Sequence, residues 1–422
     1  MPRLLYSLFF YSILPLVLLR LTYRALRAPD YRRRIGERFG FITPPPQTGG
    51  LWVHAVSVGE SIAAAPLIQH FLDHHPQLPV MVTCMTPTGS ARIRAMFGNQ
   101  VHHVYAPYDL PDAVARFLRR SQPRAAVIME TEIWPNMVCQ TARRGIPIVL
   151  ANARLSARSA RGYQRLSALS KPVVQAFSRI VAQSDDDARR FTEIGASRTQ
   201  LRVSGSIKFD VDIADPLRTQ AAALRAQFGA PRPVWIAAST HEGEDAILLA
   251  AHQQLLQQQP RALLILVPRH PERFEAVASL IAQQGMRYQR RSQGCDSETD
   301  MQVLLGDTMG ELLMLLGCAD VAFIGGSLVP RGGHNSLEAA AWGIPVLAGP
   351  SDFNFAQISQ LLQDAGGLQL LTDAPAIADA LQQLLSDDSL RRKRGEQALA
   401  VVDANRGALQ KLIDEVEGAL QN

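Results

Sequence analysis

Short apolar runs alternate with helical patterns along most of this 422-residue chain, and they fall into two separate blocks. Apolar runs of about four to eight residues are typical of strands buried on both faces, and helical patterns between them indicate parallel sheets covered by helices. The sequence therefore predicts an α/β protein. The candidate strands of the first block are Leu51–Val58, Pro79–Met85, Val101–Ala106, Ala125–Met129, Pro147–Ala151 and Ile180–Gln183. Those of the second block are Val234–Ala238, Ala262–Val267, Val303–Leu305, Val321–Ile324, Pro345–Ala348 and Leu368–Leu371.

The two blocks set the expected domain boundaries. Residues 39–210 are expected to form an N-terminal Rossmann-like domain and residues 234–388 a C-terminal one, each long enough for its own core. Residues 211–233 show no clear strand and are expected to be a linker, and residues 389–422 are expected to be helices that could pack back on the N-terminal domain. Ligands of parallel sheets bind at the carboxyl ends of the strands, so we expect the domains to face each other across a cleft.

Residues 1–38 depart from this pattern and are expected to form a membrane anchor with a basic juxtamembrane segment. Leu4–Leu19 carries no charge, and no small-residue cleavage site follows it. Its length, with Pro15 inside, leaves open whether it spans the bilayer or lies in the interface. The excess of basic residues after this run places the rest of the protein in the cytoplasm. These residues are Arg20, Arg24, Arg27, Arg32, Arg33, Arg34 and Arg38.

The cysteines and the basic residues restrict the class of protein. Four cysteines lack CxxC spacing, so buried thiols are expected rather than a disulfide framework or a zinc site. The formal net charge is +5, and nearly all basic residues are arginines, which suit carboxylates and phosphates. We expect no nucleic-acid partner. The cysteines are Cys84, Cys139, Cys295 and Cys318.

Loops with ligand-type residues follow three strands of the second block: Val267–Arg273, Gly306–Glu311 and Gly325–Glu338. In the last loop, glycines permit positive φ and close backbone approach, and Gly332 and Gly333 are expected to open a helix whose N-terminus attracts an anion. The three loops predict a nucleotide-sugar site, although a glycine-rich turn by itself is equally consistent with a structural turn.

Carboxylates follow two strands of the first block. Glu60 lies in a Gly-Glu turn after the first strand, where it can accept a proton or can simply favour the start of a helix. Glu130 and Glu132 follow the fourth strand, and two acids there suggest more than a structural role, because unpaired buried carboxylates are unfavourable. His54, inside the first strand, is expected to be a buried histidine with its hydrogen bonds satisfied.

Basic residues near the same strand ends suggest anion binding. Lys208 can offset negative charge on a leaving phosphate or a substrate carboxylate. Four arginines at spacings of four, three and four would form one positive stripe on a helix, which is either a solvated face or a site for the phosphates of an acidic acceptor. They are Arg154, Arg158, Arg161 and Arg165.

At these residues the chain resembles the 3-deoxy-D-manno-octulosonic acid (Kdo) transferases of lipopolysaccharide biosynthesis, over essentially its whole length. The resemblance implies an inverting glycosyltransferase with the two-domain GT-B fold, anchored at the cytoplasmic side of the bacterial inner membrane. It implies CMP-Kdo as donor, the lipid A precursor lipid IVA as acceptor, and no cofactor or metal. The segments that carry it are the amino-terminal anchor, His54–Glu60, Glu130–Asn136, Gly205–Asp210, Pro268–Arg273 and Gly325–Glu338.

The resemblance also implies a role for each site residue. Glu60 matches the general base, and Glu130 and Lys208 match positions that stabilise the transition state. The implied CMP-binding residues are Pro268, Arg269, Met309, Gly310, Glu311, Asn335, Ser336, Leu337 and Glu338.

Other interpretations stay open at this point. Asp210-Val211-Asp212 and Asp185–Asp187 are acidic patterns that either bind a metal or cap helices and turns. A nucleotide-sugar 2-epimerase can share the fold, and a membrane-attached anion-binding protein would explain the basic face. The sequence does not indicate the number of Kdo residues transferred, the acylation preference for the acceptor or the oligomeric state.

Overall fold

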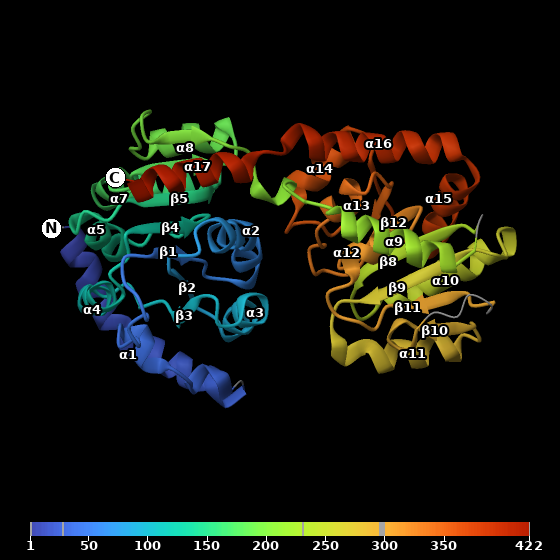
Figure 1. Cartoon of the computed structure of the whole chain (residues 1–422), viewed down its shortest axis with the longest axis horizontal. Coiled ribbons are helices and arrows are strands. Elements are labelled where there is room, and N and C mark those ends of the chain that lie inside the picture. Colours follow the sequence, from blue (N-terminus) through green and yellow to red (C-terminus); the bar gives the residue numbers. More distant parts are fainter. Residues whose placement is uncertain (1, 28, 230–231, 295–299, 422) are drawn as a thin grey trace. The chain divides into compact units, whose positions relative to one another are not determined.

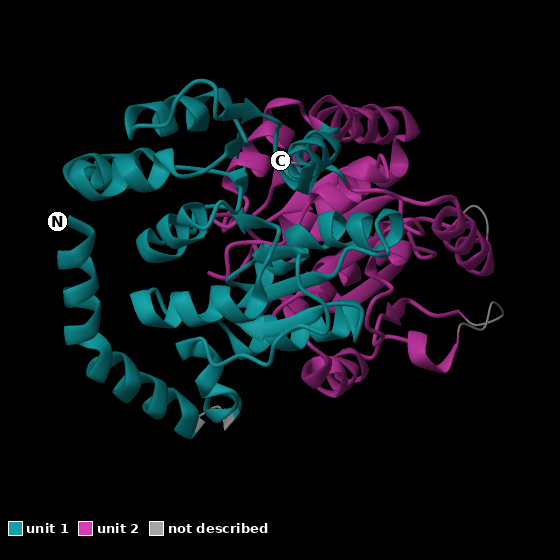
Figure 2. Ribbon diagram, turned by 60° about the vertical axis from the view of Figure 1, so that its left-hand side comes forward, with its two compact units in different colours: residues 1–210, 406–422 teal, residues 211–405 magenta. Residues whose placement is uncertain are grey.

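A computed structural model describes residues 2–27, 29–229, 232–294 and 300–421. The chain forms two compact units, shown in Figure 2: unit 1 comprises residues 1–210 and 406–422, and unit 2 comprises residues 211–405. Each unit is an α/β structure around one seven-stranded sheet, and every hydrogen-bonded strand pair that is described is parallel. The predicted α/β fold class is therefore confirmed.

The sheet of unit 1 has the strand order β3-β2-β1-β4-β5-β6-β7. Its inner strands are apolar on both faces because helices cover both faces (Figure 1). One core lies under α2, α3 and α17, and the other under α4, α5, α7 and α8. The strands are β1 Leu51–His54, β2 Val80–Cys84, β3 His102–Tyr105, β4 Ala125–Met129, β5 Ile148–Ala153, β6 Arg179–Ala182 and β7 Leu201–Val203. The α-helices are α1 Pro2–Arg27, α2 Val58–His74, α3 Pro87–Phe97, α4 Pro111–Ser121, α5 Pro135–Arg143, α6 Ala157–Arg165, α7 Ser167–Gln175, α8 Asp185–Glu193 and α17 Ala408–Gln421. Three 3-10 helices are η1 Pro29–Arg32, η2 Ile35–Phe39 and η3 Ile207–Phe209.

The sheet of unit 2 has the order β10-β11-β9-β8-β12-β13-β14. Its strands are β8 Val234–Thr240, β9 Leu263–Pro268, β10 Tyr288–Arg290, β11 Val303–Leu305, β12 Val321–Ile324, β13 Val346–Ala348 and β14 Leu368–Leu370. Its α-helices are α9 Asp215–Gln227, α10 Glu244–Gln258, α11 Phe274–Gln283, α12 Leu312–Leu316, α13 Leu337–Ala341, α14 Ala356–Asp364, α15 Ala374–Ser386 and α16 Asp388–Asn405. The 3-10 helices are η4 Pro271–Arg273 and η5 Arg291–Gln293.

All twelve predicted strands are present, and two further strands, β7 and β10, lie at sheet edges. Both have only three residues and are partly exposed, so they lack a continuous apolar run. The first predicted strand was too long at its carboxyl end. It stops at His54 because Ser57 caps the N-terminus of α2.

The segment 211–233, expected to be a linker, instead contains α9 and belongs to unit 2. Arg225 on α9 pairs with Asp320 at 2.9 Å. The segment 389–422 divides between the units, since α16 lies in unit 2 and α17 in unit 1. Asp210 fixes the start of α17, because its carboxylate accepts hydrogen bonds from the N–H groups of Gly407 and Leu409 at 2.6 and 2.7 Å.

Helix α1 packs along unit 1 through polar contacts. The hydroxyl of Tyr6 donates to Asp109 at 2.9 Å, and Ser7 lies within hydrogen-bonding distance of Asn136. Tyr11 donates to Asp112. Among the described residues, α1 is the one helix long and apolar enough to cross a membrane. Its exposed apolar side chains are Leu4, Leu5, Leu8, Phe9, Leu16, Leu19 and Leu26.

Arg34 and Arg38, from the seven arginines expected in the basic juxtamembrane segment, contact other residues of unit 1. Arg38 is buried, stacks over Tyr105 and donates to the carbonyl of Met85. Arg34 pairs with Glu37 at 2.7 Å. The expectation of buried thiols holds for Cys84 and Cys318, whereas Cys139 is half-buried, and none of these three cysteines forms a disulfide. Cys295 lies outside the described residues.

Candidate active site

Two candidate catalytic residues, Glu60 and Glu130, lie where the connections of the unit 1 sheet change direction. In unit 1, β1 neighbours both β2 and β4, so the loops after β1 and β4 diverge from adjacent strand ends. In unit 2, the loops after β8 and β12 do the same. Open α/β sheets bind ligands at such switch points. Glu60 follows β1 and Glu130 follows β4, so both carboxylates stand at the switch point of unit 1.

The turn between β1 and α2 holds the Glu60 carboxylate in a fixed orientation. Its Oε2 accepts a hydrogen bond from the N–H of Val56 and its Oε1 one from the hydroxyl of Ser57, both at 2.8 Å. Ser57 also accepts from the N–H of Glu60, which makes a capping box. Burial raises the pKa of Glu60, and the charge of Glu130 adds to this effect, while the two hydrogen bonds oppose it. Glu60 therefore both caps the helix and is a stronger base than an exposed carboxylate.

Glu130 lies between two cations. Its Oε1 is 3.7 Å from Nζ of Lys208, and its Oε2 is 3.9 Å from Nε of Arg154. Glu130 has φ of +54°, a left-handed conformation that is unfavourable for a residue with a side chain. The structure thus brings Glu60, Glu130 and Lys208 together in unit 1, as the sequence suggested for a shared site.

Lys208 reaches this site because its segment is tied to the end of β5. The side-chain oxygen of Asn152 accepts a hydrogen bond from the N–H of Ile207 at 3.3 Å. Asn152 is fully buried and has φ of +51°. Backbone strain therefore occurs directly after β4, at Glu130, and near the end of β5, at Asn152, in the two neighbouring strand ends that position the charges.

Glu132 is a third carboxylate of the site. The indole N–H of Trp134 donates to its Oε2 at 2.7 Å. Burial raises the pKa of Glu132 to about 7, with further contributions from the negative charges of Glu60 and Glu130. Three acids close together cannot all ionise without a large electrostatic cost, so one of them stays partly protonated near neutral pH.

His54 is buried as expected, but its hydrogen bonding is only half satisfied. Nδ1 lies 2.9 Å from the hydroxyl of Thr83, whereas Nε2 is buried without a partner among the described residues. Burial lowers the pKa of His54 to about 3, so the ring is neutral at physiological pH. It packs edge-on against Trp134 and supports the Glu132 side of the site.

The expected stripe of four arginines is wrong for Arg154. This residue precedes α6, and its guanidinium approaches Glu130 instead of joining Arg158, Arg161 and Arg165, which are exposed on α6. Ser156 is the N-cap of α6, so the helical spacing begins only after it. The positive face of α6 therefore contains three of the four predicted arginines.

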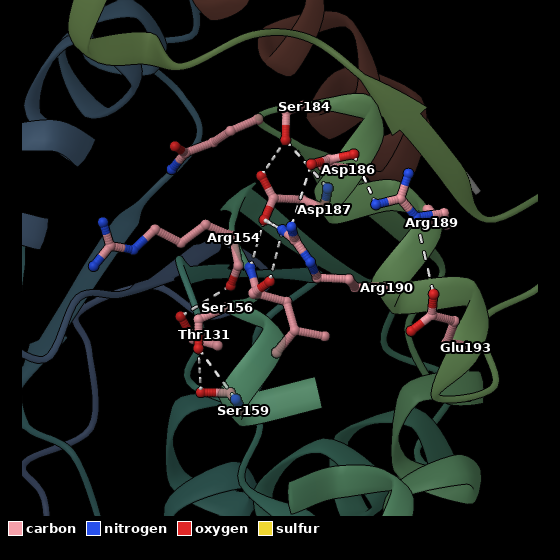
Figure 3. A network of polar contacts seen from close by, with 12 residues as sticks. Thr131, Arg154, Ser156, Ser159, Ser184, Asp186, Asp187, Arg189, Arg190 and Glu193 are labelled. Carbon is pink, nitrogen blue, oxygen red and sulfur yellow. Dashed lines mark hydrogen bonds and ion pairs between the residues drawn. The ribbon is translucent and has the colours of Figure 1, made fainter. Parts of the chain in front are cut away.

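A polar network fixes the loop that carries Arg154 (Figure 3). The carboxylate of Asp187 accepts from the N–H of Leu155 at 2.8 Å, and Thr131 donates to the carbonyl of Arg154 at 3.2 Å. Ser184 caps α8 by accepting from the N–H of Asp187. The acidic run Asp185–Asp187 therefore forms the first turn of α8, and one of its carboxylates positions the active-site loop.

In unit 2 a buried carboxylate occupies the turn after β12. Glu244 is fully buried, and its Oε1 accepts from the N–H groups of Ser327 and Leu328 at 3.0 and 2.9 Å. Its Oε2 accepts from Gly326 and His241 at 2.6 and 2.8 Å. These N–H groups, which the glycine-rich pattern offers to an anion, are thus already bound to a side chain of the protein.

The predicted helix start at Gly332 and Gly333 is wrong. Helix α13 begins at Leu337, and both glycines have left-handed φ of +87° and +68°, which a right-handed helix cannot include. Gly325 is needed for a different reason. A Cβ there would lie 2.6 Å from the carbonyl oxygen of Ser239, at the close approach of the β12 and β8 ends.

The predicted nucleotide-binding residues that follow this turn differ in burial and in hydrogen bonding. Nδ2 of Asn335 lies 3.4 Å from Oε1 of Glu338, and burial raises the pKa of Glu338. Ser336 is buried, and its hydroxyl has no partner within the described ranges. Leu337 is fully buried, so its side chain belongs to the core and leaves only its backbone for a ligand.

Arg269, after β9, lies close enough to influence neighbouring groups electrostatically. Burial lowers the pKa of His334 to about 4, and the positive charge of Arg269 contributes. The same charge opposes the raised pKa of Glu338. Pro268 ends β9 and is buried.

The loop after β11 contributes residues of differing exposure. Met309 is exposed, and Gly310 has a left-handed φ of +90°. Glu311 pairs with Arg291 at 2.8 Å and accepts from the hydroxyl of Thr308. The carboxylate of Glu311 is therefore already paired.

Sequence reasoning missed Glu244, His241 and His334 as residues of the unit 2 site. The two imidazoles stack, with Nε2 atoms 2.8 Å apart. A signal was present, because Gly243-Glu244 follows the first strand of its block as Gly59-Glu60 does. The repeated Gly-Glu pair marks a buried carboxylate at the first switch-point strand of each unit.

Comparison with known proteins agrees with this architecture. The structure of a UDP-GlcNAc 2-epimerase from Neisseria meningitidis bound to UDP-GlcNAc has a TM-score of 0.57 at 15% identity, covering 89% of this chain and 100% of that chain. At that identity the likeness shows the fold alone. Together with the two parallel sheets, it defines a GT-B fold.

The family follows from sequence similarity. A family model described as 3-Deoxy-D-manno-octulosonic-acid transferase (kdotransferase) matches residues 33–211. The 3-deoxy-D-manno-octulosonic acid transferase of Haemophilus influenzae is 43% identical, covering 98% of this chain and 99% of the relative. That of Bordetella pertussis is 38% identical, covering 99% of both. The chain belongs to the Kdo transferase family and is a glycosyltransferase.

Glu132 generates a pH prediction. Since its pKa in the folded state is raised from the ordinary 4.5 to about 7, the folded state binds more protons than the unfolded state between these pH values. Its contribution to the free energy of unfolding is therefore present below about pH 4.5 and is lost as the pH rises through about 7. We expect Glu132→Gln to reduce the pH dependence of the free energy of unfolding in this range, as measured by chemical denaturation.

Trp134 reports the same ionisation, because its indole donates to Glu132. Tryptophan fluorescence of the wild type should titrate near pH 7, and Glu132→Gln should abolish that transition. Glu193→Gln, which alters an exposed carboxylate, serves as the control. An unchanged titration in Glu132→Gln would contradict the assignment.

Proposed function

We propose that this protein transfers Kdo from CMP-Kdo to the lipid A precursor lipid IVA, with inversion at the anomeric carbon, in assembly of the lipopolysaccharide inner core. The relatives at 43% and 38% identity support Kdo as the transferred sugar. The observation that carries the proposed mechanism is the oriented, buried carboxylate of Glu60 at the switch point of unit 1.

In this proposal Glu60 is the general base. It takes the proton of the acceptor hydroxyl while that oxygen forms a bond to the anomeric carbon and the bond from this carbon to the CMP phosphate oxygen breaks. The raised pKa suits proton abstraction near neutral pH. The hydrogen bonds from Val56 and Ser57 restrict the carboxylate to one orientation.

Lys208 and Glu130 are proposed to stabilise the transition state. CMP leaves with the bonding electron pair as a monophosphate, so negative charge develops on its phosphate oxygen. Lys208 supplies a positive charge, and Glu130 holds that ammonium in place at 3.7 Å. Since a monophosphate carries less charge than a diphosphate, the step is proposed to need no metal or other cofactor.

Unit 2 is proposed to bind the CMP group. Arg269 is half-exposed at the carboxyl end of β9 and suits a phosphate. Glu338 and Asn335 offer oxygens and an amide for the ribose and base, and the hydroxyl of Ser336, which has no partner among the described residues, adds another polar group. Pro268, the Met309–Glu311 loop and the backbone of Leu337 complete the proposed site.

Helix α1 is proposed to lie in the membrane interface rather than to span the bilayer, at the cytoplasmic side of the bacterial inner membrane. The contacts of Tyr6, Ser7 and Tyr11 hold the first half of the helix against unit 1. A spanning helix would carry these residues away from the domain. Exposed leucines would enter the interface, and Arg158, Arg161 and Arg165 are proposed to bind the phosphates of the acceptor.

The transfer assay tests the proposal directly. The detergent-extracted protein is incubated with CMP-Kdo and lipid IVA, with and without EDTA. The molecular mass of the lipid product is then measured by mass spectrometry. We expect mass gains in Kdo units that persist in EDTA. Glu60→Gln should lower turnover by about 100- to 10,000-fold, because the base is lost, while CMP affinity stays unchanged.

The control for Glu60→Gln is Glu193→Gln, which should retain wild-type turnover. Full turnover by Glu60→Gln would refute the proposed base. No mass gain with the wild type, despite intact donor, would refute the transferase activity and favour an epimerase or a binding protein.

Arg269→Ala should weaken CMP binding by about 10- to 150-fold, because a hydrogen bond to a charged group contributes about 1.5–3 kcal/mol. Isothermal titration with CMP measures this change. Arg287→Ala, which removes an exposed arginine paired with Asp300, is the matched control and should bind normally. Equal affinities of the wild type and Arg269→Ala for CMP would contradict the proposed role of Arg269 in binding CMP.

The placement of α1 can be tested with an epitope tag at the N-terminus. In an interfacial arrangement, antibody should reach the tag only in inside-out vesicles, whose cytoplasmic face is exposed. A C-terminal tag on the same protein is the control for vesicle orientation. Access to the N-terminal tag in right-side-out vesicles would show that α1 spans the bilayer.

A further inference from the structure

Three potential metal ligands gather in unit 1 at the end of α2 remote from Glu60. His70 lies on the last turns of α2, His75 is its C-cap, and Glu417 projects from α17. One donor atom from each lies within 4.8 Å of the others. The Nε2 atoms of His75 and His70 are 3.1 and 3.6 Å from the same oxygen, Oε1 of Glu417.

The hydrogen bonding of this cluster is incomplete. Nε2 of His70 is buried, and it has no hydrogen-bond partner among the described residues. The ring itself is held in place, since it stacks on His74 with centroids 4.4 Å apart and meets Phe71 edge-on. A buried ring nitrogen without a partner is unfavourable, and here it faces a carboxylate oxygen at a distance too long for a hydrogen bond.

A divalent cation would satisfy all three groups at once. Two imidazoles and one carboxylate are a ligand set that zinc accepts, with bonds of about 2.0–2.2 Å. Tetrahedral coordination at that bond length places the ligand atoms about 3.3 Å apart. The two separations from Oε1 of Glu417, 3.1 and 3.6 Å, bracket this value.

We propose that His70, His75 and Glu417 bind one Zn²⁺ ion, with water as the fourth ligand. The ion would join α2 to the C-terminal helix α17. Other contacts of α17 include its apolar face in the core of unit 1, the cap by Asp210 and the ion pairs of Glu415 with Arg179 and Arg202. Zinc would add a cross-link near the end of the chain.

The site is structural rather than catalytic. His70 follows Glu60 by ten residues on the same helix, a rise of about 15 Å, so the ion cannot reach the group proposed as the base. Removal of zinc should therefore lower thermal stability without abolishing transfer in the folded protein. This separation makes the inference independent of the proposed function.

Zinc binding by the full-length protein tests the site. Untagged protein in detergent is stripped with EDTA, freed of chelator and titrated with Zn²⁺ against a chromophoric competitor. One equivalent should bind and raise the melting temperature, and Co²⁺ should give the intense visible absorption of tetrahedral coordination. No stoichiometric binding by the folded wild type would overturn the inference.

Variants distinguish this site from other zinc-binding groups. Glu417→Gln and His75→Ala should each weaken Zn²⁺ binding by more than the about 10- to 100-fold associated with loss of an outer-shell partner. Both should lose the zinc-dependent rise in melting temperature. Glu415→Gln is the matched control, because it alters a neighbouring ion pair of α17 but removes no ligand. Wild-type zinc affinity in both ligand variants would overturn the proposal.

Discussion

Parallel strand pairing is the constraint on which the rest of the structure depends. Because the described strands of each sheet run in one direction, their carboxyl ends lie at one edge. The loops at that edge carry polar residues, whereas the strands themselves are buried between helices. In unit 1 this arrangement brings Glu60, Glu130 and Lys208 together although they are far apart in sequence. The fold therefore concentrates charge without placing it inside a core.

Much of the fold could be predicted because buried parallel strands leave a strong apolar signal. β4 and β12, for example, have the predicted bounds, since each is fully buried and followed by polar or glycine residues. The edge strands β7 and β10 gave no such signal, because exposed short strands have no need of a continuous apolar run. Helix α9 was missed because its buried residues are few.

The positions of the candidate site residues were predictable where a residue lies shortly after a strand. Glu130 directly follows β4 and Glu60 lies in the first turn of the helix after β1, whereas the placement of Arg154 depended on where α6 begins, which the Ser156 cap decides. The occupation of the β12 turn by Glu244 joins residues more than eighty positions apart, a contact that no local pattern contains. Helical spacing and glycine content describe the local chain, but they do not say which distant side chain will meet it.

The Glu244 carboxylate also bears on how the nucleotide that unit 2 is proposed to bind would leave it. Three N–H groups of the turn after β12 are satisfied by Glu244, so this part of the turn does not depend on a bound phosphate for its shape. Departure of a product bound here as proposed would therefore leave these three donors paired. Each cycle of the proposed reaction would then begin with the same turn already formed, and affinity for the proposed donor would depend on the side chains around it.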